Sequence, residues 1–244
     1  MTSMPPFIMI AAPSWRSRAY LQGMAAIGLL PCHVYLLPGV PGSADGLGDS
    51  YPVEAEPGIP SWIFSPHTPI MECIEEYNIP STRLSEPDIN HADTITLLNQ
   101  CSESVVLYSG AAGTLLRRPL LACGKRFLHV HGGFAPAYRG STAFYYSLLK
   151  DGTLGATALW MEEAIDEGPI LRRDVYPARE HVEIDRVLDP LVRSQTLLRV
   201  LIETKDQGAW AEGFQPDPDE FTFTYYVVHP LLKHLVLQQQ GLCS

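Results

Sequence analysis

The sequence predicts an α/β fold with an open, mostly parallel sheet, and three observations support this. Residues 6–12 (PFIMIAA) are an apolar run typical of a buried strand, and residues 31–39 are a second run that stops at Pro-Gly. Residues 14–28 between them space their apolar side chains as a helix does. Strand, helix and strand in this order give two parallel strands joined by a right-handed crossover. The alternation continues to residue 205, so we expect one domain over residues 1–205 and a C-terminal extension over residues 206–244.

The later elements follow from the same patterns. Helices are expected over 70–79, 92–102, 113–124, 141–152 and 185–205, and strands over 81–86, 104–110, 125–132, 154–161 and 169–177. Ser141 is the candidate N-cap of its helix. Pro119 is expected to break its helix or to mark where it starts again, and Pro190 is expected to kink its own. Residues 38–68 are rich in Gly, Pro, Ser and Asp, which predicts a long loop or insertion that is either disordered or functional as a lid.

The composition narrows the class of protein. The chain has 244 residues, of which 46% are hydrophobic and 18% charged, so an ordinary core is feasible. The net charge of −10 without a basic stripe argues against a nucleic-acid partner. The five cysteines are odd in number and contain no CxxC pair, which fits a reducing compartment better than disulfides or a zinc cluster. No signal peptide or membrane-length apolar run is visible, so we expect a cytoplasmic protein without a membrane partner.

Two histidines stand at the end of a predicted strand. His129 and His131 are two residues apart, so on a strand they face the same side while Val130 faces the other. Gly132 and Gly133 follow at once and allow the backbone to turn close to a ligand. Because open parallel sheets bind ligands beyond the carboxyl ends of their strands, this position suits a functional site.

Asp166 stands in the turn between the next two predicted strands. Ile165 precedes it and residues 169–171 are apolar, so the carboxylate is partly sheltered, and its pKa should be raised unless a cation lies near. Taken singly, an aspartate in a turn or a histidine on a strand is most often structural. His-x-His with a distal aspartate also suits a zinc or iron hydrolase, although no third ligand has suitable spacing.

Residues 104–171 resemble the folate-dependent formyltransferase family, which includes methionyl-tRNA and glycinamide ribonucleotide formyltransferases. That family carries a strand ending in Asn-x-His, then a Pro-x-Tyr-Arg-Gly loop, a helix, a strand and Asp-x-Gly. The matching residues here are His131, Pro136, Tyr138, Arg139, Gly140, Asp166 and Gly168. The stretch VVLYSGAAGTLL resembles the strand and turn that the family places beside the folate pteridine. The resemblance implies a Rossmann-like sheet of the formyltransferase type.

The resemblance also assigns roles to individual residues. It implies 10-formyltetrahydrofolate as co-substrate and no metal. The implied catalytic residues are His129, His131 and Asp166; the implied folate-binding residues are Tyr108, Ser109, Gly110, Gly113, Leu115 and Ile165; the implied substrate-binding residues are Gly132, Gly133, Tyr138 and Arg139. In the family, the Asn and His bind the developing oxyanion and the Asp assists proton removal.

His129 is the departure from the family pattern, because it occupies the position of the family's catalytic Asn. It can donate through one ring nitrogen, or it can act as a base. Three functions therefore stay open: formyl transfer to a small amine, an altered reaction such as hydrolysis, condensation or cyclisation of another acyl substrate, and a non-catalytic folate-like binding protein. His91 is an outside candidate for the site, whereas His229 and His234 are expected to be structural.

The C-terminal extension bears on the acceptor. The tRNA-specific relatives add a C-terminal β-barrel, and residues 206–244 are too few for one. With the acidic charge, this predicts a small amine, an amino acid derivative or an amino sugar as acceptor. The extension is expected to pack on the domain or on a partner subunit, in which case the protein would be a homodimer.

Overall fold

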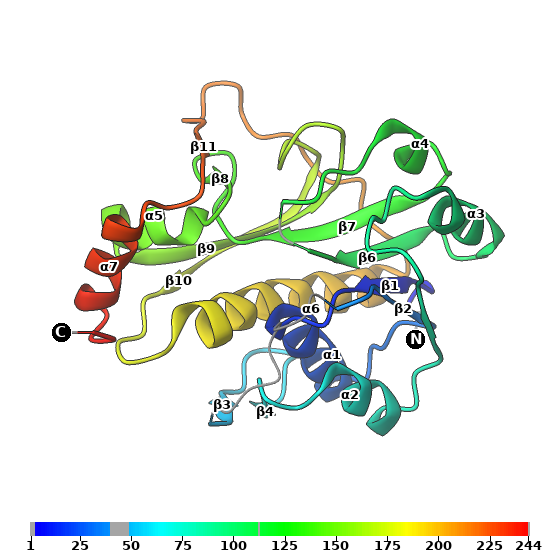
Figure 1. Ribbon diagram of the computed structural model, residues 1–244, viewed down its shortest axis with the longest axis horizontal. Helices are drawn as coiled ribbons and strands as arrows, with labels where there is room; N and C mark the ends of the chain where they lie inside the picture. The colour runs from blue at the N-terminus through cyan, green and yellow to red at the C-terminus, as the bar shows by residue number, and fades with distance from the viewer. Residues whose placement is uncertain (1–2, 40–48, 112, 244) are drawn as a thin grey trace.

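The central element is a mostly parallel sheet of seven strands, formed within the residues that the computed structural model describes, 3–39, 49–111 and 113–243. Its order is β10-β9-β7-β6-β1-β2-β5 (Figure 1). The strands are β1 (Ile8–Ala11), β2 (Val34–Leu36), β5 (Ser81–Arg83), β6 (Val105–Ser109), β7 (Arg126–His131), β9 (Thr153–Trp160) and β10 (Ile170–Pro177). The run from β5 to β7 is parallel, and β9 is antiparallel to both of its neighbours. The predicted α/β fold is confirmed.

The parallel strands are continuous apolar runs because both of their faces are covered. Every residue of β1 and β6 is buried. The register places Met9 opposite Val34 on one side and Leu107 on the other. As a result, β1, β6 and β7 all end at one edge of the sheet.

Helices cover both faces of the sheet (Figure 1). On one face, α1 (Trp15–Ile27) packs against the long helix α6 (Asp189–Gln207), with α2 (Ile70–Glu76) beside α1. On the other face lie α3 (Ala92–Gln100) and the short α4 (Arg118–Leu121). Helix α1 begins at Ser14, whose side chain accepts a hydrogen bond from the Ser17 N–H, and this cap brings the first turn of α1 to the carboxyl end of β1.

Three local predictions about helices are wrong in detail. Helix α4 has four residues instead of the span 113–124, but it starts with Pro119 in its first turn, as one of the two alternatives expected, because a missing N–H costs nothing there. Ser141 is not the N-cap of α5 (Ala143–Asp151); Thr142 holds that position with φ 50°. The Thr142 Oγ1 instead accepts from the Val228 N–H at 2.8 Å. Helix α6 is preceded by a π-helical turn, Ile184–Leu188, and Pro190 stands in its first turn without interrupting it.

Residues 49–68 are more ordered than the predicted loop. They contain a hairpin of β3 (Tyr51–Val53) and β4 (Trp62–Phe64) that lies beside α1. Val53, Ile59 and Phe64 are buried in the core under it. Residues 40–48, the other part of the predicted insertion 38–68, lie outside the described residues.

The C-terminal extension packs on the domain. Its strand β11 (Thr224–Tyr225) pairs in parallel with β8 (Arg139–Gly140), and α7 (Pro230–Gln239) lies against α5. The Tyr225 ring stacks on those of Tyr138 and Tyr146, with ring centroids 5.5 and 4.4 Å apart. Within the described residues, no helix combines the length and the apolar character that a membrane span requires.

Candidate active site

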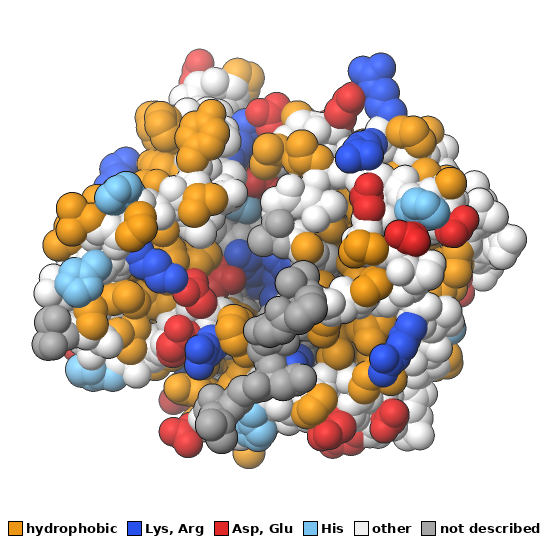
Figure 2. All heavy atoms as spheres, viewed as in Figure 1, with side chains coloured by type: hydrophobic (Ala, Val, Ile, Leu, Met, Phe, Trp, Pro, Cys, Tyr) orange, Lys and Arg blue, Asp and Glu red, His pale blue; other side chains and the backbone are white. Residues whose placement is uncertain are grey.

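A pocket of about 470 Å³ opens at the carboxyl edge of the sheet, and several of the predicted site residues line it. His129, His131 and Asp166 meet there, together with Arg16 and Arg193. Figure 2 shows basic, acidic and histidine side chains gathered in the hollow at the centre of this face. The pocket therefore combines both charges with two imidazoles.

His129 and His131 point to the same side of β7, while Val130 between them is buried in the core below. The Nδ1 atom of His129 lies 3.3 Å from the carbonyl oxygen of Tyr108. A carbonyl only accepts, so this nitrogen carries the hydrogen when the bond is made. Burial, followed by the nearby charge of Arg16, lowers the pKa of His129 to about 3, so the ring is neutral near neutral pH.

His131 is held from both sides. Its Nε2 donates to the carbonyl oxygen of Tyr138 at 2.7 Å, and its Nδ1 lies 3.2 Å from Oδ2 of Asp166. The residue is only 5% exposed. The ring orientation is therefore fixed by two acceptors on different segments of the chain.

Asp166 reaches His131 through a loop that doubles back. Because β9 is antiparallel to β7, it ends with Trp160 opposite Leu128, and residues 161–169 must return toward the carboxyl end of β7. Asp166 itself has φ 54° in this loop. Its Oδ2 also accepts from the Gly140 N–H at 2.9 Å.

The pKa of Asp166 is lowered. Burial alone would raise it, but His131, His129 and the Gly140 N–H together outweigh the burial. The rise expected for a sheltered carboxylate without a nearby cation therefore does not occur. The carboxylate stays ionised at neutral pH.

Two arginines of the pocket were missed by the sequence analysis. Arg193 on α6 donates from Nε to Oδ1 of Asp189 at 2.8 Å and from Nη1 to the Val130 carbonyl at 3.2 Å. Burial alone would lower its pKa, but the charge and hydrogen bond of Asp189, together with the nearby Tyr20 and Asp166, outweigh the burial and raise it. Its signal was the Asp189/Arg193 pair at helical spacing in the predicted helix 185–205.

Arg16 lies in the first turn of α1. Its Nε donates to the Ser109 hydroxyl at 3.2 Å, and its Nη2 donates to the Gly110 carbonyl. Burial, and then the like charge of Arg193, lowers its pKa. A cation immediately after the first predicted strand was a usable signal, because that strand end lies at the ligand-binding edge of the sheet.

Of the other predicted site residues, only some line the pocket. Tyr108, Gly113, Leu115 and Ile165 line the pocket, whereas Gly110 lines a second pocket beside it and Ser109 is fully buried under Arg16. The four residues implied for substrate binding, Gly132, Gly133, Tyr138 and Arg139, do not line either pocket.

These four residues instead lie behind the site. A Cβ on Gly132 would stand 2.4 Å from Arg193 Nη2, so the Arg193 side chain fills that space. The Tyr138 hydroxyl donates to Asp151 Oδ2 at 2.5 Å, and Arg139 pairs with Glu167 at 3.0 Å. Their geometry supports the position of His131 and of the Asp166 loop.

Three outlying histidines lie away from the pocket. His91 and His229 accept backbone N–H bonds at the starts of α3 and α7, and His234 lies 3.6 Å from Cys243 Sγ. The pocket wall instead includes Thr142 and residues 224–227, which no sequence motif marked. Over the described ranges of the chain, no group of three or more His, Cys, Asp or Glu side chains is arranged to hold a metal ion.

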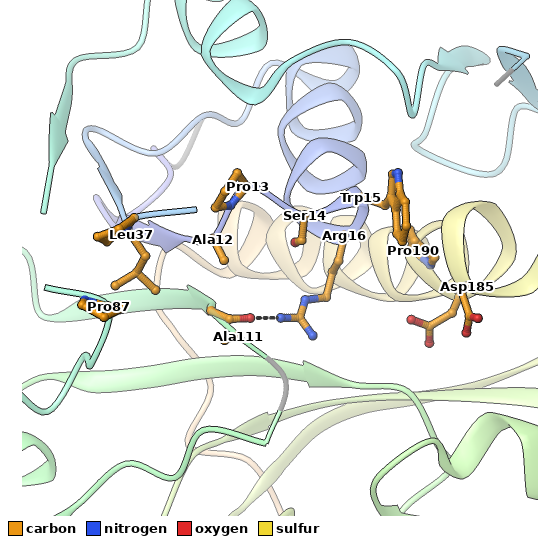
Figure 3. A pocket seen from close by; sticks show the side chains of 13 residues that line it. Ala12, Pro13, Ser14, Trp15, Arg16, Leu37, Pro87, Ala111, Asp185 and Pro190 are labelled. Atoms are coloured by element: carbon orange, nitrogen blue, oxygen red, sulfur yellow. Dashed lines mark hydrogen bonds between the residues drawn. The ribbon is translucent and has the colours of Figure 1, made fainter. Parts of the chain in front are cut away.

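The second pocket, of about 290 Å³, lies between the start of α1 and the start of α6. Figure 3 shows Trp15 and Asp185 on one side of it, Leu37 and Pro87 on the other, and Arg16 between them. Arg16 and Ala111 line both pockets, so the two adjoin at the end of β6.

An open sheet with a histidine–aspartate pair at its carboxyl edge defines the class, an α/β protein with a candidate acid–base site. The family follows from sequence comparison. The family model described as Formyl transferase matches residues 69–196, which is more than half of the chain. The chain therefore belongs to the formyl transferase family of enzymes, and His129, His131 and Asp166 all lie within the matched residues.

Curated relatives agree with this family. The chain is 27% identical over 146 residues to methionyl-tRNA formyltransferase of Magnetococcus marinus, covering 58% of this chain and 46% of the relative. The same enzyme of Trichodesmium erythraeum is 28% identical over 174 residues, covering 68% of this chain and 48% of the relative. The chain thus spans about half the length of these relatives.

Solved structures share the fold at low sequence identity. A sugar N-formyltransferase from Shewanella sp. FDAARGOS_354 superposes with a TM-score of 0.58 at 13% identity, covering 96% of this chain and 87% of that one. Phosphoribosylglycinamide formyltransferase from Streptococcus pneumoniae TIGR4 gives 0.56 at 14% identity, covering 84% and 98%. At these identities the likeness establishes the fold alone.

Proposed function

We propose that this protein transfers a formyl group from 10-formyltetrahydrofolate to the amine of a small acceptor. The observation that carries the proposal is the 3.2 Å contact between His131 Nδ1 and Asp166 Oδ2 in the wall of the larger pocket, within the segment that matches the family model. Family membership supplies the reaction class. The geometry supplies residues that can hold and accept a proton.

The lining of the larger pocket supports a folate co-substrate. Its wall includes Leu115, Leu116, Met161 and Ile165, and the side chains of Leu115 and Ile165 are 51% and 47% exposed. Exposed apolar side chains gathered at one pocket are typical of a surface that a planar ligand covers. The folate, when bound, supplies a formyl carbon that an amine can attack.

The chain's own residues handle the proton and the geometry. In the overall reaction the amine nitrogen bonds to the formyl carbon, the bond from that carbon to N10 breaks, and one proton passes from the amine to N10. Asp166 stays ionised, and its Oδ2 already accepts from Gly140 and faces His131. Its Oδ1, which has no hydrogen-bond partner among the described residues, can accept the proton of the attacking amine.

We infer a small acceptor. The adjoining pocket of about 290 Å³ has room for a small molecule, and the two carboxylates in its wall, Asp185 and Asp189, are already paired with Lys233 and Arg193. The net charge of −10 disfavours a polyphosphate backbone. The curated relatives are named for methionyl-tRNA, so aminoacylated tRNA belongs in the test as the competing acceptor.

Incubation with 10-formyltetrahydrofolate and a panel of acceptors, read by mass spectrometry, tests the proposal. The panel contains amino sugars, amino acids, a ribonucleotide amine and methionyl-tRNA. A formylated small amine is the expected product. A formylated tRNA would overturn the inferred acceptor, and failure to formylate any amine would overturn the reaction.

His129 is the reason to consider a second function, because a histidine at the position of the family's Asn supports altered chemistry. The same incubation distinguishes formyl transfer from the alternatives. Formate released without an acceptor would indicate hydrolysis. Tight folate binding with neither product would indicate a binding protein.

A further inference from the structure

His129 presents a lone pair to the pocket. Its Nδ1–H is directed to the Tyr108 carbonyl at 3.3 Å, so in the neutral ring Nε2 carries no hydrogen. No described residue makes a hydrogen bond to Nε2. An Asn amide at this position would offer a hydrogen to a carbonyl oxygen, and neutral His129 in this tautomer cannot.

Arg16 is the candidate donor to replace that amide, because it lines the same pocket and its charge acts on His129 more strongly than that of Arg193. Ser109 and the Gly110 carbonyl fix its Nε and Nη2, and both of these groups lie at the end of β6, next to the Tyr108 carbonyl that holds His129. Its Nη1 makes no hydrogen bond to any described residue. The guanidinium group therefore has a fixed position and a spare donor.

Arg16 also lacks a counter-charge. Arg193 pairs with Asp189 at 2.8 Å, whereas no carboxylate of the described residues lies within ion-pair distance of Arg16. A sheltered cation without a partner is costly, so a site that keeps one is built for negative charge. Arg16 lines both pockets, and Figure 3 shows it in the smaller one, so that charge would develop where acceptor and donor meet.

We propose that Arg16 stabilises the carbonyl oxygen of the formyl group during transfer, in place of the amide that His129 replaces. As the amine nitrogen bonds to the formyl carbon, the carbonyl electron pair moves to oxygen, which accepts a hydrogen bond from Arg16 Nη1. When the bond to N10 breaks, the pair returns and Arg16 keeps all its protons. This inference rests on the proposed formyl transfer.

The kinetic test is a double-mutant cycle with Arg16→Gln, His129→Asn and the double variant. Arg16→Gln should lower kcat about 10²–10³-fold with the acceptor KM nearly unchanged, because a donor that acts on the transition state is lost. Adding His129→Asn should recover at least about tenfold, since an amide donor returns. The kcat of Arg16→Lys, which keeps the charge, should lie between those of the wild type and Arg16→Gln. Arg117→Gln, at an exposed arginine, is the control and should keep the wild-type kcat.

Two kinetic outcomes would overturn the proposal. A raised acceptor KM with kcat intact would make Arg16 an anchor for an anionic acceptor. Absence of rescue by His129→Asn in a folded double variant, checked by circular dichroism, would show that the two residues do not share one task.

A second readout needs no turnover. In protein with nitrogen-15 in its histidine rings, NMR should show the Nδ1–H form of His129 in the wild type. Its titration should move to higher pH in Arg16→Gln, but not in Arg117→Gln. The Nε2–H form, or an unmoved titration, would refute the inference even in a protein that transfers formyl. If the wild type shows both NMR results but transfers no formyl group, the outcome contradicts the proposed function alone.

Discussion

Asp166 Oδ2 lies 3.2 Å from His131 Nδ1, although an antiparallel strand separates the two residues along the chain. The same oxygen accepts the Gly140 N–H at 2.9 Å, so one carboxylate oxygen ties the 161–169 loop to both β7 and β8. The Asp166 carboxylate therefore both holds the loop in position and supplies the negative charge beside His131. Substitutions that remove one of these two roles and keep the other are therefore informative.

Asp166→Asn keeps the size of the side chain and removes its charge. The amide oxygen can still accept from Gly140, but the group can no longer take a proton or hold His131 electrostatically. We expect formyl transfer to fall about 10²–10⁴-fold with little change in Tm. Steady-state rates and thermal unfolding measured on the same preparation check this.

Glu163→Gln, in the same loop, is the matched control. Glu163 is 60% exposed and pairs with the exposed Arg118 at the surface, so transfer should change less than about threefold. Equal losses in both variants would mean that the loop as a whole, and not the carboxylate of Asp166, matters for turnover.

Much of this site could be predicted from local pattern. The strand period places His129 and His131 on one face of β7, and the chain order of strands and helices gives the sheet. The pairing of Asp166 with His131 could not be derived that way, because it depends on a loop that returns along an antiparallel strand. That step came from the family resemblance.

Other features carried too little local signal. The β3–β4 hairpin has three-residue strands, one of them containing Pro52, and is held by burial of Val53 and Phe64 under α1. Propensity alone assigns such a segment to a loop. Tyr225 reaches the pocket from the C-terminal extension by pairing with β8, a contact between distant segments that no sequence spacing encodes.

His129 should make the stability of the protein depend on pH. Its folded pKa of about 3 lies below its ordinary value of 6.5, so the unfolded chain binds the proton more readily over that range. The stabilisation that comes from the neutral ring should therefore be fully present above pH 6.5. As the pH drops toward 3, the unfolding free energy should fall by at most about 1.4 kcal/mol per pH unit. His129→Asn removes this contribution, so its curve should be flatter from pH 6.5 to 4.

Urea unfolding of both proteins at several pH values measures the difference, in which contributions shared by the two proteins cancel. His129→Gln should behave as His129→Asn does, which separates titration from packing. Parallel curves for wild type and both variants would show that the ring titrates normally in the folded protein.

Tyr225 should couple the C-terminal extension to the pocket. Its ring stacks between Tyr138 and Tyr146, and Thr224 to Val227 form part of the pocket wall. Tyr225→Ala should lower the unfolding free energy by about 1–3 kcal/mol and raise the KM for the folate. Phe221→Ala, at a side chain 61% exposed, should do neither. An unchanged KM in Tyr225→Ala would separate the extension from ligand binding.

Gly168 is the last position with a clear expectation, because no side chain fits there. A Cβ would stand 1.8 Å from the Trp160 carbonyl oxygen, in the loop that the Trp160 N–H closes by donating to the Pro169 carbonyl at 2.9 Å. Backbone cannot yield as a flexible side chain does. Gly168→Ala should therefore cost about 1–3 kcal/mol and displace the loop that carries Asp166.

Gly124→Ala separates this clash from ordinary backbone strain. Gly124 has φ 76° and open space around its Cβ position, so alanine there costs about 1–2 kcal/mol through its left-handed conformation alone. Both variants should lose similar stability, but only Gly168→Ala should lose formyl transfer, by a factor close to that of Asp166→Asn. Full activity in a destabilised Gly168→Ala protein would show that Asp166 keeps its place without the tight turn, and that the family's Asp-x-Gly spacing serves folding here.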